Sequence, residues 1–130
     1  MEPAEALADL KQISTQIDRA VIARHDGTLE AASLADPTTA GRMASAAADL
    51  YRAADQTGST LERPPLTQLE VATPTGSVFA VRDSERIACA VTGPDPTVGL
   101  IFYDLKACLR SIGEEPELEV ASLGGDDGEA

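Results

Sequence analysis

The chain has 130 residues, enough for one domain that buries roughly two-thirds of its unfolded surface. Hydrophobic residues make up 43% of it, but only two Phe, two Tyr and no Trp are among them, which predicts an aliphatic, alanine-rich core. The formal net charge is -12, and no cluster of Lys and Arg is present, so we expect binding neither to nucleic-acid phosphates nor to anionic lipid surfaces.

The first third of the chain reads as a helix followed by a hairpin. Apolar residues at helical spacing predict an amphipathic helix over residues 4–17. Residues 19–23 then read as a strand, and residues 28–33 as the strand that returns. Between them, Asp26-Gly27 is a strong turn signal, because Gly accepts positive φ without steric cost. The predicted apolar stripe of the helix comprises Leu7, Leu10, Ile13 and Ile17.

A long middle helix is expected next. Asp36-Pro37-Thr38 supplies a helix start, since proline fixes φ and Asp or Thr can accept a bond from a free backbone N–H. The helix is predicted to run to about Gln56, with an apolar arc wider than one sheet face needs. We interpret the alanine-rich surplus of this arc as a contact with a second subunit. The centre line of the arc is Met43, Ala47, Leu50 and Ala54.

Three short strands and a final helix complete the predicted domain. The strands are residues 66–73, 77–82 and 87–92, joined by polar turns. The second and third are apolar throughout, which is typical of central strands covered on both faces. Thr97 opens the last helix, whose apolar stripe ends at Ile112.

This order of elements predicts the fold class. Helix, two strands, helix, three strands, helix (α-β-β-α-β-β-β-α) with short links indicates an α/β (α+β) domain with a five-stranded, mainly antiparallel sheet. The middle helix is expected on one face and the terminal helices on the other. The domain is predicted at residues 1–112, followed by an acidic tail at 113–130 that we expect to be disordered. Leu118, Val120 and Leu123 could form a short docking segment in that tail.

Cysteine usage and the N-terminus bear on compartment and metal binding. Cys89 and Cys108 have no C-x-x-C or Cys/His spacing, so we expect buried thiols and no zinc site, metal or other cofactor. The opening residues MEPAEALADL have no basic segment followed by a long apolar run, and no stretch approaches about 18 apolar residues. A cytoplasmic protein without a membrane-inserted segment is therefore expected.

No catalytic constellation is evident. His25 beside Asp26 could transfer protons, but both fall on a hairpin tip, where a turn role is favoured. A Ser or Cys nucleophile would need a histidine partner, and this is the only histidine. Asp95 and Asp104 could pair as carboxylates, although solvated surface charges are the favoured interpretation. The glycines of TGPDPTVG match no phosphate-binding loop, so the sequence predicts no enzyme.

A polar face on the middle helix has two interpretations. It is either the solvent-facing side of the helix or a charged docking face for a partner. The candidate partner-binding residues on it are Arg42, Ser45, Asp49 and Arg52.

The sequence resembles the Roadblock family, which includes dynein light chains and bacterial partners of Ras-like GTPases. The resemblance rests on IDRAVIARHDGTLEAAS after the first helix, on ATPTGSVFAVRDSERIACAVTGPDPTVGLIFYDLKACLR at the end, and on the alanine-rich helix between them. It covers about residues 4 to 112. Family membership implies a noncatalytic homodimer that binds a Ras-like small GTPase and modulates its nucleotide cycle or localisation.

The resemblance also implies dimerisation through the middle helix and the strand that follows it, the elements that carry the apolar surplus and an exposed strand edge. The predicted dimer contact comprises Ala40, Ala44, Ala47, Ala48, Tyr51 and Asp55 on the helix, with Gln68 and Glu70 on the strand. An alternative is a small-molecule-sensing domain of the PAS or profilin-like kind. That alternative needs an internal cavity, which small core residues such as Ala80, Ala88 and Ala90 could leave.

Overall fold

The computed structural model describes residues 1–113, which form three helices and five strands. The elements occur in the predicted order. They are α1 (Pro3–Ile13), β1 (Ile17–Arg24), β2 (Leu29–Ala32), α2 (Pro37–Thr60), β3 (Gln68–Thr73), β4 (Gly76–Arg82), β5 (Arg86–Thr92) and α3 (Val98–Gly113). The predicted acidic tail lies outside the described residues, except for Gly113 at the end of α3.

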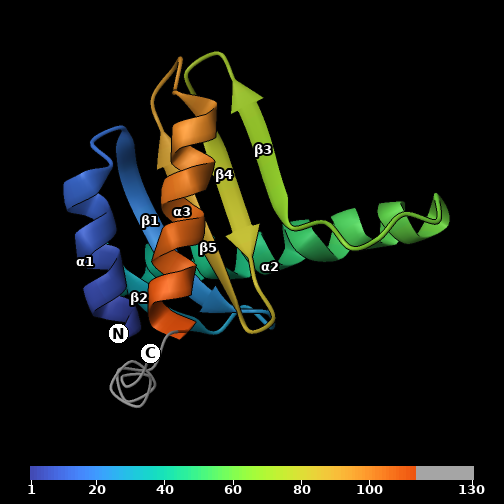
Figure 1. The fold of residues 1–130 in the computed structure, drawn as a ribbon, viewed down its shortest axis with the longest axis horizontal. Helices are drawn as coiled ribbons and strands as arrows, with labels where there is room; N and C mark the ends of the chain where they lie inside the picture. Colours follow the sequence, from blue (N-terminus) through green and yellow to red (C-terminus); the bar gives the residue numbers. More distant parts are fainter. Residues whose placement is uncertain (114–130) are drawn as a thin grey trace, which may run out of the picture.

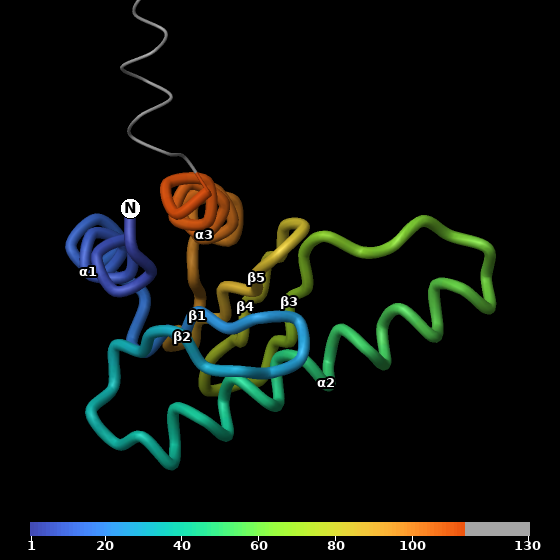
Figure 2. Tube along the Cα trace, turned by 90° about the horizontal axis from the view of Figure 1, so that it is seen from below, coloured from blue at the N-terminus to red at the C-terminus, as the bar shows by residue number. Residues whose placement is uncertain are grey.

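The strands form one antiparallel sheet in the order β2-β1-β5-β4-β3. Figure 1 shows α1 and α3 lying over one face of this sheet, and Figure 2, turned by 90°, shows α2 along the opposite face. The three hairpin links, β1–β2, β3–β4 and β4–β5, and the layer arrangement were predicted from the sequence and are confirmed. The order leaves β2 and β3 as the two edge strands.

The sheet separates two apolar cores. The larger one lies between the sheet and the helices α1 and α3, and it includes Phe79, which meets the ring of Phe102 edge to face at 5.2 Å between centroids. The smaller one lies under α2 and is built mostly from alanine and other small side chains around Tyr51. Small side chains let α2 approach the sheet closely. The alanine-rich core that the composition predicted is present in this layer.

Local capping explains where α2 begins. The carboxylate of Asp36 accepts hydrogen bonds from the backbone N–H of Thr38 (3.2 Å) and the hydroxyl of Thr39 (2.6 Å), so it caps the helix as expected. These bonds hold the pKa of Asp36 below its ordinary value.

The predicted turn between β1 and β2 is also confirmed. Gly27 takes a φ of +93° there and lies against α2 beside Ser45.

Two predicted boundaries were wrong. Helix α1 ends at Ile13, which is 70% exposed although it was placed on the predicted stripe, and Ile17 is the first residue of β1, buried in the larger core. Helix α2 extends one turn beyond Gln56, to Thr60. The residues after Ile13 include no Gly or Pro to mark a stop, and the helix accommodates Gly58 instead of ending there. Periodicity alone therefore misplaces both ends.

Candidate interaction surface

Helix α2 presents one buried and two exposed sides. The buried side packs on the sheet and contains five of the residues predicted to contact a second subunit, each at most 3% exposed. These side chains are covered by the protomer itself, so any contact with a second copy has to use other residues of α2. The five buried residues are Ala40, Ala44, Ala47, Ala48 and Tyr51.

The apolar surplus of α2 lies on one flank of this buried side. Met43, Ala46 and Leu50 line an open apolar groove of about 300 Å³ between the helix and the strands β3, β4 and β5. On the sheet side, the groove is lined by Val71 of β3, which is 43% exposed, and by three residues further inward. Those three are Val78, Cys89 and Val91. The predicted surplus of apolar surface therefore exists, displaced by part of a helical turn from the residues first assigned to it.

The open edge of β3 borders the same groove. This strand pairs with β4 along its whole length and has no partner on its other side among residues 1–113. Gln68 and Glu70 are exposed, as the edge-strand prediction requires. An edge strand with unpaired backbone groups is a template for pairing with another chain.

The opposite flank of α2 is polar and faces solvent. Arg42, Ser45, Asp49 and Arg52 are all exposed there, so the structure brings the four candidate partner-binding residues together on one surface. Arg52 and Asp49 form an ion pair in which both side chains remain more than half exposed. Such a pair contributes little to stability, and both groups stay accessible to another molecule.

Arg42 and Arg19 line a second, wider hollow, which sequence reasoning did not identify. This hollow has a volume of about 640 Å³ and lies where the start of α2 faces the β3–β4 turn. Neither arginine belongs to an ion pair within residues 1–113, although Asp18 lines the same hollow. The two arginines come from β1 and α2, which are separate elements of the chain, so the sequence alone gives no local signal for this site.

An arginine clamp fixes the end of the buried side of α2. The guanidinium of Arg82 makes two hydrogen bonds to Asp55, at 2.9 and 2.5 Å, and lies 4.3 Å above the ring of Tyr51. Its Nε also donates to the backbone carbonyl of Leu66, and the Tyr51 hydroxyl donates to that of Thr67. Asp55, predicted as a dimer contact, therefore has an intramolecular partner. The hydrogen bonds from Arg82 hold the pKa of Asp55 below its ordinary value.

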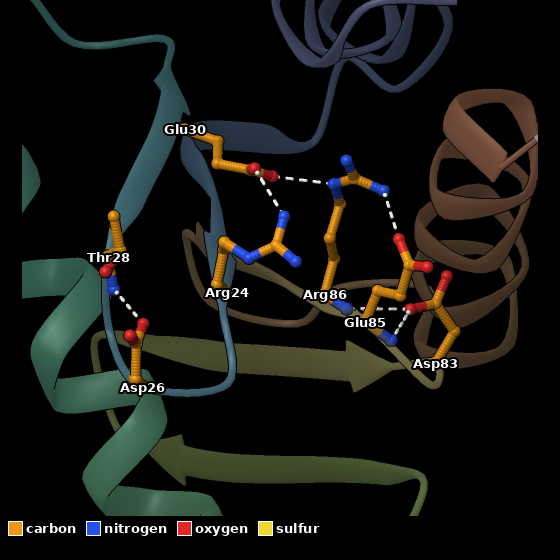
Figure 3. A network of polar contacts seen from close by, with 7 residues as sticks. All are labelled: Arg24, Asp26, Thr28, Glu30, Asp83, Glu85 and Arg86. Carbon is orange, nitrogen blue, oxygen red and sulfur yellow. Dashed lines mark hydrogen bonds and ion pairs between the residues drawn. The ribbon is translucent and has the colours of Figure 1, made fainter.

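A second polar network joins β1, β2 and the β4–β5 turn, as Figure 3 shows. Glu30 accepts hydrogen bonds from Arg86 (2.6 Å) and Arg24 (3.1 Å). Burial alone would raise the pKa of Glu30, but the two arginines outweigh it and hold that pKa below its ordinary value. The Nε2 atom of His25 lies 2.8 Å from the backbone oxygen of Asp83. The only histidine of the sequence therefore connects the β1–β2 turn with the β4–β5 turn.

The cysteines and the two aspartates named as chemical candidates differ in how far they are buried. Cys89 and Cys108 are buried thiols, as predicted, and burial raises the pKa of each to about 11. Asp95 is exposed, but Asp104 is only 8% exposed, so the solvated-surface interpretation was wrong for Asp104. Residues 1–113 contain no group of three or more side chains placed to hold a metal ion. None of the helices they form has the length and hydrophobicity that a membrane crossing needs.

Solved structures with this fold include several bacterial proteins. A Roadblock/LC7 domain from Streptomyces avermitilis superposes with a TM-score of 0.79 at 19% identity, covering 86% of this chain and 95% of that one. Myxococcus xanthus MglB gives a TM-score of 0.72 at 11% identity, covering 82% and 87%. The gliding protein MglB from Thermus thermophilus gives 0.71 at 12% identity, covering 83% of each chain. At these identities the likeness shows a shared fold.

The sequence itself identifies the family. The profile of the Roadblock/LC7 domain matches residues 4–92, which run from α1 to the end of β5 and make up more than half of the chain. No curated protein sequence gives a significant match. With its α-β-β-α-β-β-β-α order and antiparallel five-stranded sheet, this chain belongs to the Roadblock/LC7 domain family.

Proposed function

We propose that this chain is a noncatalytic adaptor that pairs with a second copy of itself and binds a Ras-like small GTPase. The observation that carries the proposal is the apolar groove beside α2, which runs up to the unpaired edge of β3. An apolar helix flank next to an open strand edge allows two copies to bury side chains and pair backbone groups together. Because a twofold contact uses the same patch on both copies, one exposed patch of this kind is sufficient.

The family likeness supports the choice of partner. The resemblance to the Roadblock family implies a regulator of Ras-like GTPases. MglB from two bacteria shares this fold. One MglB structure is described as having a tetrameric arrangement, so self-association occurs among the similar proteins. On this chain the exposed polar flank of α2 offers charged groups of both signs, which suits electrostatic recognition of another protein.

The dimer is tested by light scattering of a matched pair of variants. Ala46→Glu places a charge on the apolar flank, where a second copy would have to bury it, so dissociation is expected. Gln56→Glu adds the same side chain at an exposed position of the polar flank and should leave the dimer intact. Tyr51→Glu and Ala44→Glu are unsuitable, because both positions lie in the protomer core. A wild-type chain that remains monomeric at high concentration would contradict the proposal.

GTPase binding is tested separately, by pull-down with a Ras-like GTPase from the same genome loaded with GTP or GDP. We expect the two nucleotide states to be retained unequally, because a regulator of the nucleotide cycle must distinguish them. Arg42→Glu combined with Arg52→Glu should weaken retention. Arg63→Glu, on the exposed loop after α2, is the matched control. Equal failure of both nucleotide states to bind would remove the GTPase from the proposal and leave the dimer standing.

A further inference from the structure

The sequence of the edge strand β3 occurs a second time in the chain, with conservative changes at its two ends. Residues 68–73, which form β3, read QLEVAT, and residues 117–122, beyond the described part, read ELEVAS. The four central residues are identical, and the flanking pairs Gln/Glu and Thr/Ser have nearly the same size and polarity. Residues 117–122 therefore have the same alternation of apolar and polar side chains as a strand that this domain already pairs.

The position of β3 shows what this alternation does in the sheet. Leu69 pairs with Ala80 and Val71 with Val78, and these partners contact the core under α2. Because paired residues share a face, Leu69 and Val71 lie on the α2 side and Glu70 on the other. Val71 is 43% exposed at the rim of the apolar groove, so this rim is unfilled within the protomer.

We propose that residues 117–122 of one chain pair with the open edge of β3 in a second chain, as an added antiparallel strand. In the register that sets Val120 opposite Val71, both valines lie on the α2 side and extend the apolar groove. The same register sets Glu70 opposite Ala121 and Glu119 opposite Ala72, so no two glutamates face each other.

The direction of the strand identifies a second copy as its source. Arg110 of α3 and Thr67, just before β3, line the same small hollow, so the last turns of α3 lie beside the start of β3. Only residues 114–116 separate α3 from the repeat, and three residues span about 10 Å at most. A tail that starts at this end can run along its own β3 only in the parallel direction. In that direction the matching register sets Glu119 beside Glu70, where like charges repel.

This pairing would also regulate the proposed dimer, and that regulatory role rests on the proposed function. If two copies pair through β3, each β3 edge meets the β3 strand of the other copy. Residues 117–122 offer nearly the same side chains to that edge. The C-terminal segment then competes with the contact between the two β3 strands, and its release favours that contact. The pairing of residues 117–122 with β3 itself does not depend on the dimer.

The test uses the full-length chain carrying Leu118→Asp and Val120→Asp, so that its own repeat cannot compete. The probe is a fluorescent synthetic peptide of residues 114–124, and the control peptide carries the same two substitutions. We expect saturable binding of the first peptide, at least tenfold tighter than that of the control, measured by fluorescence anisotropy. Hydrogen exchange should slow at residues 68–73 and stay unchanged at β2, the other edge strand.

Equal binding of the two peptides, or protection at β2 in place of β3, would overturn the inference. Light scattering of the same double variant keeps the two proposals apart. A dimer whose β3 amides ignore the peptide would sink the inference and leave the proposed function intact. A monomer whose β3 amides are protected by the peptide would support the inference and contradict the proposed dimer.

Discussion

Gly76 and Gly41 show how differently two glycines of one domain respond to a side chain. A Cβ at Gly76 would collide with the backbone carbonyl of Thr92 on β5, whereas a Cβ at Gly41, inside α2, would meet nothing within 4 Å. We predict that Gly76→Ala destabilises the fold, by about 1–3 kcal/mol for a forced backbone shift. Gly41→Ala should stabilise it by up to about 1 kcal/mol, because alanine has the higher helix propensity. Urea denaturation of both variants checks the opposite signs.

The Arg82–Asp55 pair makes stability depend on pH in a defined direction. The folded pKa of Asp55 lies below its ordinary value of 3.8, so the pair stabilises the fold above that value. This contribution is lost as pH falls through the folded pKa. Since the Asp55 side chain is 41% exposed, solvent screening limits the expected cost of Asp55→Asn to about 1 kcal/mol at neutral pH.

The measurement is a series of denaturation curves between neutral and strongly acidic pH. The difference between Asp55→Asn and the wild type should shrink as the solution becomes more acidic than the ordinary pKa of the carboxyl. Asp49→Asn removes an ion pair whose members are both more than half exposed, and it should change stability little at any pH. A difference that persists in strong acid would show that Asp55 acts through packing.

At the scale of elements, α2 illustrates what a sequence pattern can and cannot fix. Its apolar arc is about twice as wide as one contact needs, and this width correctly indicated a surplus. Which half of the arc faces the sheet depends on the strands that α2 packs against, β1, β2 and β5, and on the Arg82 clamp, which come from other parts of the chain. The alanines predicted to contact a second copy lie on the half that is buried against the sheet, and the other half carries exposed Ala46 with half-buried Met43 and Leu50.

The last turns of α2 stand apart from the rest of the helix. No residue after Tyr51 is buried in this helix, and Figure 1 shows its end projecting past the sheet. Its hydroxyls turn back to the helix itself, as when Thr57 donates to the carbonyl of Ala53 at 3.1 Å. We predict that amides 56–60 exchange with solvent faster than amides 44–51, because no tertiary packing protects them.

Gly58→Ala tests that explanation for the end of α2. A Cβ there would have its nearest neighbours at 4.0 Å, so the alanine fits and raises helix propensity by about 1 kcal/mol. Exchange of amides 56–60 should slow about fivefold, and exchange in the central strand β5 should not change. Unchanged exchange at the end of α2 would mean that another contact, such as a second copy, already holds these turns.

For the whole molecule, the order of elements was predictable because most of the links between elements carry their own local signal. Asp26-Gly27 and Asp36-Pro37 mark boundaries without help from the rest of the chain. The hollow between Arg19 and Arg42, the burial of Asp104 and the exposure of Ile13 arise only when separate elements meet, so no local pattern shows them. Ala80, Ala88 and Ala90, on which the small-molecule-sensing alternative depended, are fully buried between sheet and helices.

Self-association also has a consequence for stability that a single chain cannot show. If only the folded chain pairs, the dimer stabilises the fold by mass action, and the melting temperature rises with protein concentration. Ala46→Glu should abolish that dependence, and Gln56→Glu should preserve it. At the lowest concentrations, where the wild type is mostly monomeric, Ala46→Glu should melt within a few degrees of it, because Ala46 is exposed in the protomer. A large loss of stability there would place Ala46 in the fold of the single chain, and differential scanning calorimetry over a concentration series decides between the two.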